Sequence, residues 1–125
     1  MYEWGGTLRE TVLWTNASPT SQMAETSITL SEDITNFDYI KIYWRLSTTN
    51  DLECSILVEP TKISHNNVNV NAISITSRST GSSYGRVIYV GNTNDIIFVT
   101  TAAVRGGSSL NNGMAIITKI SGLNI

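Results

Sequence analysis

Charged residues are scarce in this chain of 125 residues: they make up 14% of the composition, against roughly 25% in an average protein. Eight Lys and Arg residues stand against ten Asp and Glu residues, so the formal net charge is -2. A nucleic-acid-binding surface needs clustered basic side chains that displace counterions from phosphates. We therefore expect no nucleic-acid partner.

Cysteine and histidine each occur once. Cys54 can form no disulfide within the chain, and its alternate position in an apolar segment indicates a small core residue. His65 is the one imidazole that could activate a serine, and it lies in a polar loop. A structural zinc site needs four ligands close together, so we expect no metal and no cofactor.

Long apolar runs are also missing. No segment approaches the roughly 20 apolar residues that a membrane-spanning helix requires. The sequence does not open with a charged and then apolar leader. We expect a soluble chain that enters no membrane and carries no signal peptide.

Helical periodicity is absent as well, because apolar residues nowhere recur at spacings of three and four over three turns. The chain instead has short alternating segments, separated by Ser, Thr, Asn and Gly. We mark eight: residues 8–14, 24–30, 37–46, 53–58, 68–77, 84–90, 95–101 and 114–120. They predict one all-β domain over residues 1–125, an antiparallel β-sandwich of about eight strands resembling a jelly roll.

Five further predictions concern single parts of the chain. The inner face of residues 8–14 would hold Leu8, Val12 and Trp14, and that of residues 24–30 would hold Ala24, Thr26, Ile28 and Leu30. In residues 68–77 the apolar set changes phase, which predicts a β-bulge near Asn71 and Ala72. Residues 91–94 read as a hairpin turn, and residues 31–36 could form one helical turn.

Residues 37–46 alternate more strictly than any other segment. One face would hold Ile40, Ile42, Trp44 and Leu46; the other would hold Tyr39, Lys41, Tyr43 and Arg45. Successive side chains of a strand leave opposite faces. The first set therefore predicts a core, and the second an outer face of aromatic rings and cations.

We expect this outer face either to meet an identical subunit or to stack on a sugar ring, and a plain exposed surface is the third alternative. Tyr and Arg are enriched at protein interfaces, and aromatic rings bind the C–H faces of sugars. The same argument adds Tyr84 and Arg86. His65 and Asn66 would supply hydrogen-bonding groups to a ligand cleft.

The sequence contains no recognisable catalytic constellation. Glycoside hydrolysis needs two carboxylates that face each other. The acidic residues of this chain fall at strand ends, in turns or at outward strand positions, where such residues are ordinary. We expect no catalytic residues and no enzyme activity.

Four motifs carry a family resemblance: LWTNASPT at residues 13–20, ITL at 28–30, FDYIKIYW at 37–44 and MAIITKI at 114–120. Their order resembles the C-terminal modules of tail fibre and minor structural proteins from phages and prophages of Gram-positive bacteria. The resemblance implies a non-enzymatic β-sandwich, often a homotrimer, that is displayed at a tail tip and attaches to bacterial surface saccharide.

The resemblance also implies a location in the virion, or in the bacterial cytoplasm before lysis releases the particles. The family supplies no fixed binding residues, so the candidate residues above depend on this sequence alone. Two alternatives stay open: a pure assembly module of the tail that binds no glycan, and a tail enzyme that degrades polysaccharide.

Overall fold

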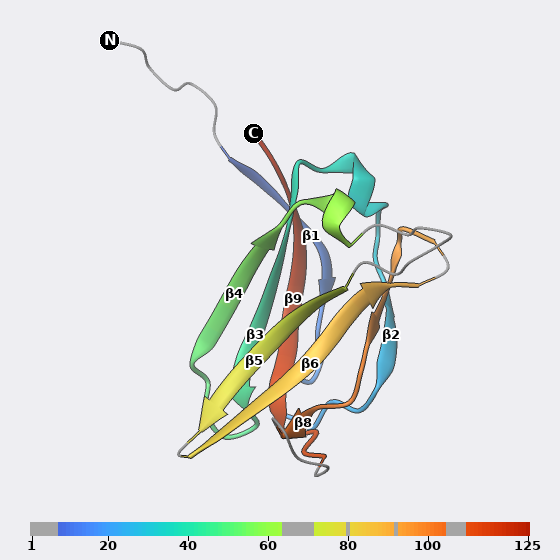
Figure 1. The fold of residues 1–125 in the computed structure, drawn as a ribbon. Coiled ribbons are helices and arrows are strands. Elements are labelled where there is room, and N and C mark those ends of the chain that lie inside the picture. The colour runs from blue at the N-terminus through green and yellow to red at the C-terminus, as the bar shows by residue number, and fades with distance from the viewer. Residues whose placement is uncertain (1–7, 64–71, 80, 92, 105–109) are drawn as a thin grey trace.

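The protein, seen in a computed structural model, is described over residues 8–63, 72–79, 81–91, 93–104 and 110–125. Within these ranges, nine strands form two antiparallel sheets that face each other (Figure 1). The predicted all-β antiparallel sandwich is therefore confirmed.

Sheet A contains four strands, in the order β1 (Arg9–Thr15), β9 (Met114–Asn124), β3 (Tyr39–Ser47) and β4 (Glu53–Val58). Sheet B has the order β2 (Thr26–Thr29), β7 (Ile96–Val99), β6 (Ser82–Val90) and β5 (Ala72–Ser79), and β8 (Ala103–Val104) pairs with β6. Two 3-10 turns, η1 (Ile34–Asn36) and η2 (Pro60–Lys62), lie together at one end of the sandwich (Figure 1). Nothing helical in the described ranges is long and apolar enough to cross a membrane.

The chain crosses repeatedly between the two sheets. It changes sheet between β1 and β2, β2 and β3, β4 and β5, and β8 and β9. The first strand, β1, pairs with β9 in sheet A. A hairpin keeps β3 and β4 together in the same sheet. The jelly-roll form of the sandwich stays a prediction.

The core lies between the sheets and is formed by the inward side chains of both. On β3, Ile40 and Ile42 are completely buried and Trp44 is nearly so, as the alternation predicted, while Leu46 is half-buried. The facing side chains of sheet B include Ile75, Ile88 and Ile97, all completely buried. Cys54 is partly buried against this core.

Strand β1 departs from the predicted pattern. Leu13 is buried, whereas Leu8 and Val12 are 47% and 48% exposed. The register of β1 against β9 shifts between Val12 and Trp14, which marks a β-bulge. The extra residue changes which side chains point inward, so the prediction of an inward Leu8 and Val12 was wrong. Trp14 packs against the core while partly exposed.

Strand β2 is shorter than the segment predicted over residues 24–30. Ile28 and Leu30 are buried as predicted. Ala24 precedes the strand and is exposed, and Thr26, its first residue, is only half-buried. The inward prediction was therefore wrong for Ala24.

The predicted turns can be followed in the connections. Strands β6 and β7 pair as an antiparallel hairpin, and the N–H of Gly91 donates to the carbonyl of Ile96 at 2.7 Å, so the predicted hairpin connection is confirmed, while Asn92 within it lies outside the described residues. The helical turn expected in residues 31–36 is η1. The bulge predicted near Asn71 and Ala72 falls where Asn71 is outside the described residues and β5 begins at Ala72.

Arg86 is a buried core residue, only 1% exposed, and not part of an outer ligand or interface face. The physical reason is strand alternation: Arg86 shares the inner face of β6 with Ile88 and Val90, both buried. Burial lowers the pKa of the guanidinium to about 10, so it still carries its charge at neutral pH.

Backbone carbonyls compensate this buried charge. Arg86 Nη1 donates to the carbonyl of Thr100 at 3.0 Å, and Nη2 donates to that of Asn112 at 3.1 Å. Both Nε and Nη2 donate to the carbonyl of Met114, at 3.3 and 3.2 Å. The side chain thus ties β6 of sheet B to the start of β9 in sheet A. Hydrogen-bonded partners of this kind are what make a buried charge tolerable.

We expect Arg86→Lys to lower the free energy of unfolding by about 3 kcal/mol, because one ammonium group cannot satisfy acceptors spread over a planar fork. Urea unfolding followed by circular dichroism would measure the loss. Arg78→Lys, on an exposed residue of β5, is the matched control and should change stability by less than about 0.5 kcal/mol. Equal stability of the two variants would contradict the bridging role.

Candidate functional site

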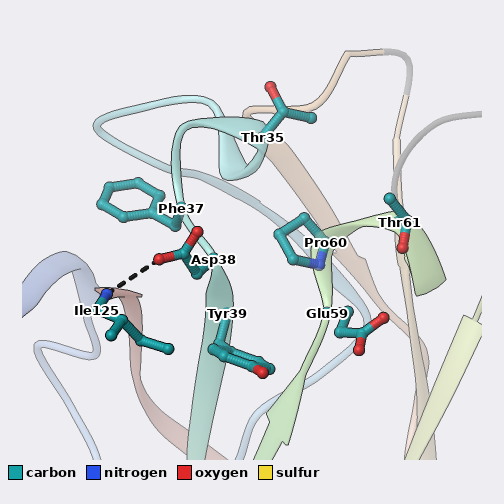
Figure 2. Close-up of a pocket in the computed structure, with 8 residues that line it drawn as sticks. All are labelled: Thr35, Phe37, Asp38, Tyr39, Glu59, Pro60, Thr61 and Ile125. Atoms are coloured by element: carbon teal, nitrogen blue, oxygen red, sulfur yellow. Dashed lines mark hydrogen bonds between the residues drawn. The ribbon is translucent and has the colours of Figure 1, made fainter. Parts of the chain in front are cut away.

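An open hollow of about 490 Å³ lies at the end of the sandwich where the two 3-10 turns meet the start of β3 and the end of β4 (Figure 2). We call it the end pocket. Eight of the described residues line it: Thr35, Phe37, Asp38, Tyr39, Glu59, Pro60, Thr61 and Ile125. One of them, Tyr39, is a candidate from the sequence.

Local interactions of η1 position the first wall. The carboxylate of Asp33 accepts from the N–H of Thr35 at 2.8 Å and caps the turn, and the Ile34 side chain is completely buried beneath it. After the turn, the Phe37 ring lies against the backbone of Gly122 on β9: a β-carbon there would be 2.4 Å from the ring. Only glycine allows this close approach.

Asp38 fastens the start of β3 to the end of β9. Its carboxylate accepts from the N–H of Ile125 at 3.0 Å, as Figure 2 shows, and its own N–H donates to the side-chain oxygen of Asn124 at 3.0 Å. One side of the carboxylate is therefore structural. The other oxygen has no hydrogen bond within the described residues and remains able to accept from a ligand.

Tyr39 and Glu59 form the opposite wall. The Tyr39 ring is half-buried and extends from β3 toward Glu59 (Figure 2). Glu59 precedes η2, and Pro60, whose fixed φ suits the first position of a helical turn, is buried. The Glu59 carboxylate is exposed and makes no hydrogen bond or ion pair with the described residues.

The end pocket can do binding chemistry of one recognisable kind. An aromatic face suits the C–H surface of a sugar ring, and carboxylate oxygens accept hydrogen bonds from hydroxyl or ammonium groups. Among the described residues, no Lys or Arg lines the hollow, so it offers no counter-charge to a phosphate or a carboxylate.

The other candidates on β3 belong to a different cluster, on the outer face of sheet A. Tyr43 is only 9% exposed, and its hydroxyl donates to the carboxylate of Glu10 on β1 at 2.7 Å. The ammonium groups of Lys119 and Lys41 lie 4.3 and 4.8 Å from the centre of its ring. Lys119 is also 3.6 Å from Glu10. A ring covered in this way cannot serve as a platform for a sugar, which corrects that reading of Tyr43.

The same cluster alters the protonation of both of its acids. Burial, and then the hydrogen bond to Glu10, raises the pKa of Tyr43 to about 12. The hydrogen bond from Tyr43 is the largest cause of a lowered pKa at Glu10, and the two lysines act in the same direction. Tyr43 thus stays neutral and Glu10 ionised over a wide range of pH.

The remaining candidates are dispersed. Arg45 is half-buried and its Nη1 donates to the carbonyl of Pro19 at 3.0 Å, so it supports the loop after β1. Tyr84 lies on β6 of sheet B, half-buried beside a separate hollow. His65 and Asn66 fall outside the described residues. The structure therefore does not bring the described members of the predicted set together, and among them Tyr39 alone reaches the end pocket.

Asp38, Glu59 and Thr35 are site residues that the sequence did not single out as a group. The signal was present only in part: an acidic residue directly before Tyr39, and the Glu-Pro pair that follows the fourth alternating segment. What joins them is the meeting of η1 and η2, which no local pattern specifies.

Within the described parts of the chain, no group of three or more His, Cys, Asp or Glu side chains could hold a metal ion.

The sequence matches no protein-family model and no curated protein. The chemistry of the end pocket must therefore be argued from its own residues.

We expect tyrosinate absorbance to show Tyr43 titrating near pH 12, as the difference between the unaltered chain and Tyr43→Phe. Because the folded pKa is raised, the contribution of Tyr43 to stability is complete below pH 10 and is lost as pH rises toward 12. Glu10→Gln should lower the midpoint, while Glu25→Gln, on an exposed carboxylate before β2, should leave it unchanged. Titration of Tyr43 near pH 10 would contradict the buried arrangement.

Glu10 makes the stability of the same cluster depend on pH on the acid side as well. Its folded pKa is lowered, so its contribution is complete above the ordinary value of 4.5 and is lost as pH falls below it.

Proposed function

We propose that this domain is a non-enzymatic head of the phage tail fibre type, which assembles as an oligomer and attaches to saccharide on a bacterial surface through the end pocket. The observation that supports binding is the placement of a half-buried Tyr39 ring in one open hollow with the carboxylates of Asp38 and Glu59. Aromatic stacking together with a few convergent polar groups is a common plan for small-molecule recognition.

The charge of the end pocket suggests the class of saccharide. Two carboxylates line it, and within the described residues no basic side chain does. An anionic sugar or a phosphodiester would therefore meet repulsion there, and the ionised groups would stay unpaired. A neutral sugar or one that carries an amino group would gain hydrogen bonds, and the amino group would gain charge attraction as well.

Three of the four motifs behind the tail fibre resemblance lie on neighbouring strands. Residues 13–15 end β1, residues 39–44 open β3, and residues 114–120 open β9, in the strand order β1, β9, β3. The fourth motif, residues 28–30, lies at the end of β2 in sheet B. The motifs thus reach both sheets of the sandwich, which supports reading them as the pattern of a domain.

We expect Tyr39→Ala to weaken binding to neutral or amino-bearing cell-wall glycans by at least about tenfold, in line with the loss of roughly 1.4 kcal/mol of stacking and burial. Tyr39→Phe should retain most of the affinity, because the ring is kept. A glycan array followed by titration calorimetry would measure the affinities.

Tyr84→Ala is the matched control, because Tyr84 is also half-buried but lies on sheet B, away from the end pocket. Its affinity should equal that of the unaltered chain. Binding that is lost in Tyr84→Ala and kept in Tyr39→Ala would place the saccharide elsewhere and overturn the assignment of the end pocket.

Binding without catalysis is part of the proposal. One oxygen of Asp38 is engaged by the N–H of Ile125, so that carboxylate has a structural task in the end pocket. Purified cell-wall polysaccharide incubated with the protein should release no product. Product release that Glu59→Gln abolishes would show that the pocket is catalytic after all.

The second candidate function is an assembly module that binds no glycan, and one feature of sheet B favours it. The outer face of that sheet is almost without charge and carries a stacked pair of aromatic rings, Tyr89 and Phe98. Absence of binding on the array, with an intact oligomer, would favour this candidate.

A further inference from the structure

The outer face of sheet B can be defined from the strand alternation. Ile28, Ile75, Ile88 and Ile97 point into the core and are buried. Their sequence neighbours therefore point outward. These outer-face residues are Ser27 and Thr29 on β2, Ile96 and Phe98 on β7, Ser83, Gly85, Val87 and Tyr89 on β6, and Ser74, Thr76 and Arg78 on β5.

This face carries almost no charge. Of those residues only Arg78 is charged, and it pairs with Ser83 near the end of β5. The outer face of sheet A differs, since Glu10, Lys41 and Lys119 gather there around Tyr43. The centres of protein interfaces are depleted of charged residues and enriched in aromatic ones. By charge, the outer face of sheet B fits an interface better than that of sheet A, although exposed apolar side chains also occur on sheet A at Val12 and Leu57.

Two aromatic side chains, Tyr89 and Phe98, form a ridge on the outer face of sheet B. The rings of Tyr89 and Phe98 stack with their centres 5.0 Å apart and their planes 21° from parallel. Both side chains are half-exposed although they bury one side against each other. Val87, the next outward residue on β6, is 39% exposed. Rigid aromatic surface of this kind can be buried at small entropic cost.

A hollow lies on the same face, farther along β6. It has a volume of about 280 Å³ and is lined by Ser74, Thr76, Ser83, Tyr84, Gly85, Arg86, Val87, Ala103 and Val104, of which Arg86 is only 1% exposed. Gly85, which has no side chain, is part of its lining: a β-carbon there would lie 3.4 Å from the Ile75 carbonyl and 3.9 Å from Thr76 Oγ1, in ordinary contact, so the position can accept a side chain. The face therefore holds both a projection and a recess.

We infer that copies of this chain associate through the outer face of sheet B, with the Tyr89–Phe98 ridge of one copy in the Gly85 hollow of the next. A surface that carries a ridge and a hollow can be complementary to itself, which is what a two-fold interface between identical subunits requires. A nearly uncharged face also meets its own copy without like-charge repulsion. The inference specifies the oligomer of the proposed function but is independent of the end pocket.

The test is the mass of the full chain in solution, by light scattering and sedimentation. Val87→Lys places a charge between ridge and hollow and should raise the dissociation constant at least about tenfold, so that the oligomer falls to a single chain. Leu57→Lys is the matched control: Leu57 is also an exposed aliphatic residue within a strand, 52% exposed, but lies on sheet A. It should leave the oligomer intact.

A second variant keeps the interface testable if Val87→Lys fails to fold. Gly85→Leu fills the hollow with an apolar side chain and should dissociate the oligomer without introducing a charge. Circular dichroism should show unchanged strand content for all three variants.

Two outcomes would overturn the inference. A strictly monomeric chain at every soluble concentration would remove the interface altogether. An oligomer that Leu57→Lys dissociates and Val87→Lys does not would move it to sheet A. Titration of the same variants with glycans separates the proposals, because a monomeric Val87→Lys should still bind through Tyr39.

Discussion

The hydrogen bonds from Arg86 to three backbone carbonyls fix the two sheets relative to each other, at the end of the sandwich opposite the end pocket. Within the described residues, its hydrogen-bond acceptors are all main-chain oxygens, at Thr100, Asn112 and Met114. A carboxylate partner could move with its own side chain, but carbonyl oxygens move only with the backbone. The guanidinium therefore fixes the path of the chain where β7 ends and where β9 begins.

The backbone beside this charge is strained at one residue. Ala115, directly after Met114, adopts a left-handed conformation with φ of 51°, which disfavours any residue that has a β-carbon. Such strain persists only where the surroundings determine the conformation. Here the Met114 carbonyl accepts two bonds from Arg86, and the N–H of Thr48 donates to the carbonyl of Gly113 at 2.9 Å.

Alternation in the sequence was a reliable guide to the strands and a weaker one to their faces. Residues 53–58 coincide with β4, and the inward set of β3 is buried as predicted. The faces failed at β1, where the bulge after Val12 depends on the register with β9, some hundred residues away in sequence. Register between distant strands is a tertiary property, which no window along the chain contains.

The site residues divide in the same way. Alternation with Ile88 and Val90 does place Arg86 on the inner face of β6, so the signal existed, but the rule that charges lie outside opposed it. Tyr43 gave no such signal, because its partner Glu10 comes from a non-adjacent strand. Tyr39 could be predicted as a binding residue because its aromatic ring lies on the outward face of residues 37–46.

The central position of β9 has a consequence for biosynthesis. This strand pairs with β1 on one side and with β3 on the other, yet it follows both by many residues. A ribosome therefore delivers the middle of sheet A after its flanks, whereas β5, β6 and β7 can pair as each emerges. Until β9 arrives, β1 has no partner strand and β3 has only β4. Sheet B can therefore assemble during translation, while sheet A must wait for β9 and meanwhile exposes strand edges that chaperones or neighbouring nascent chains can reach.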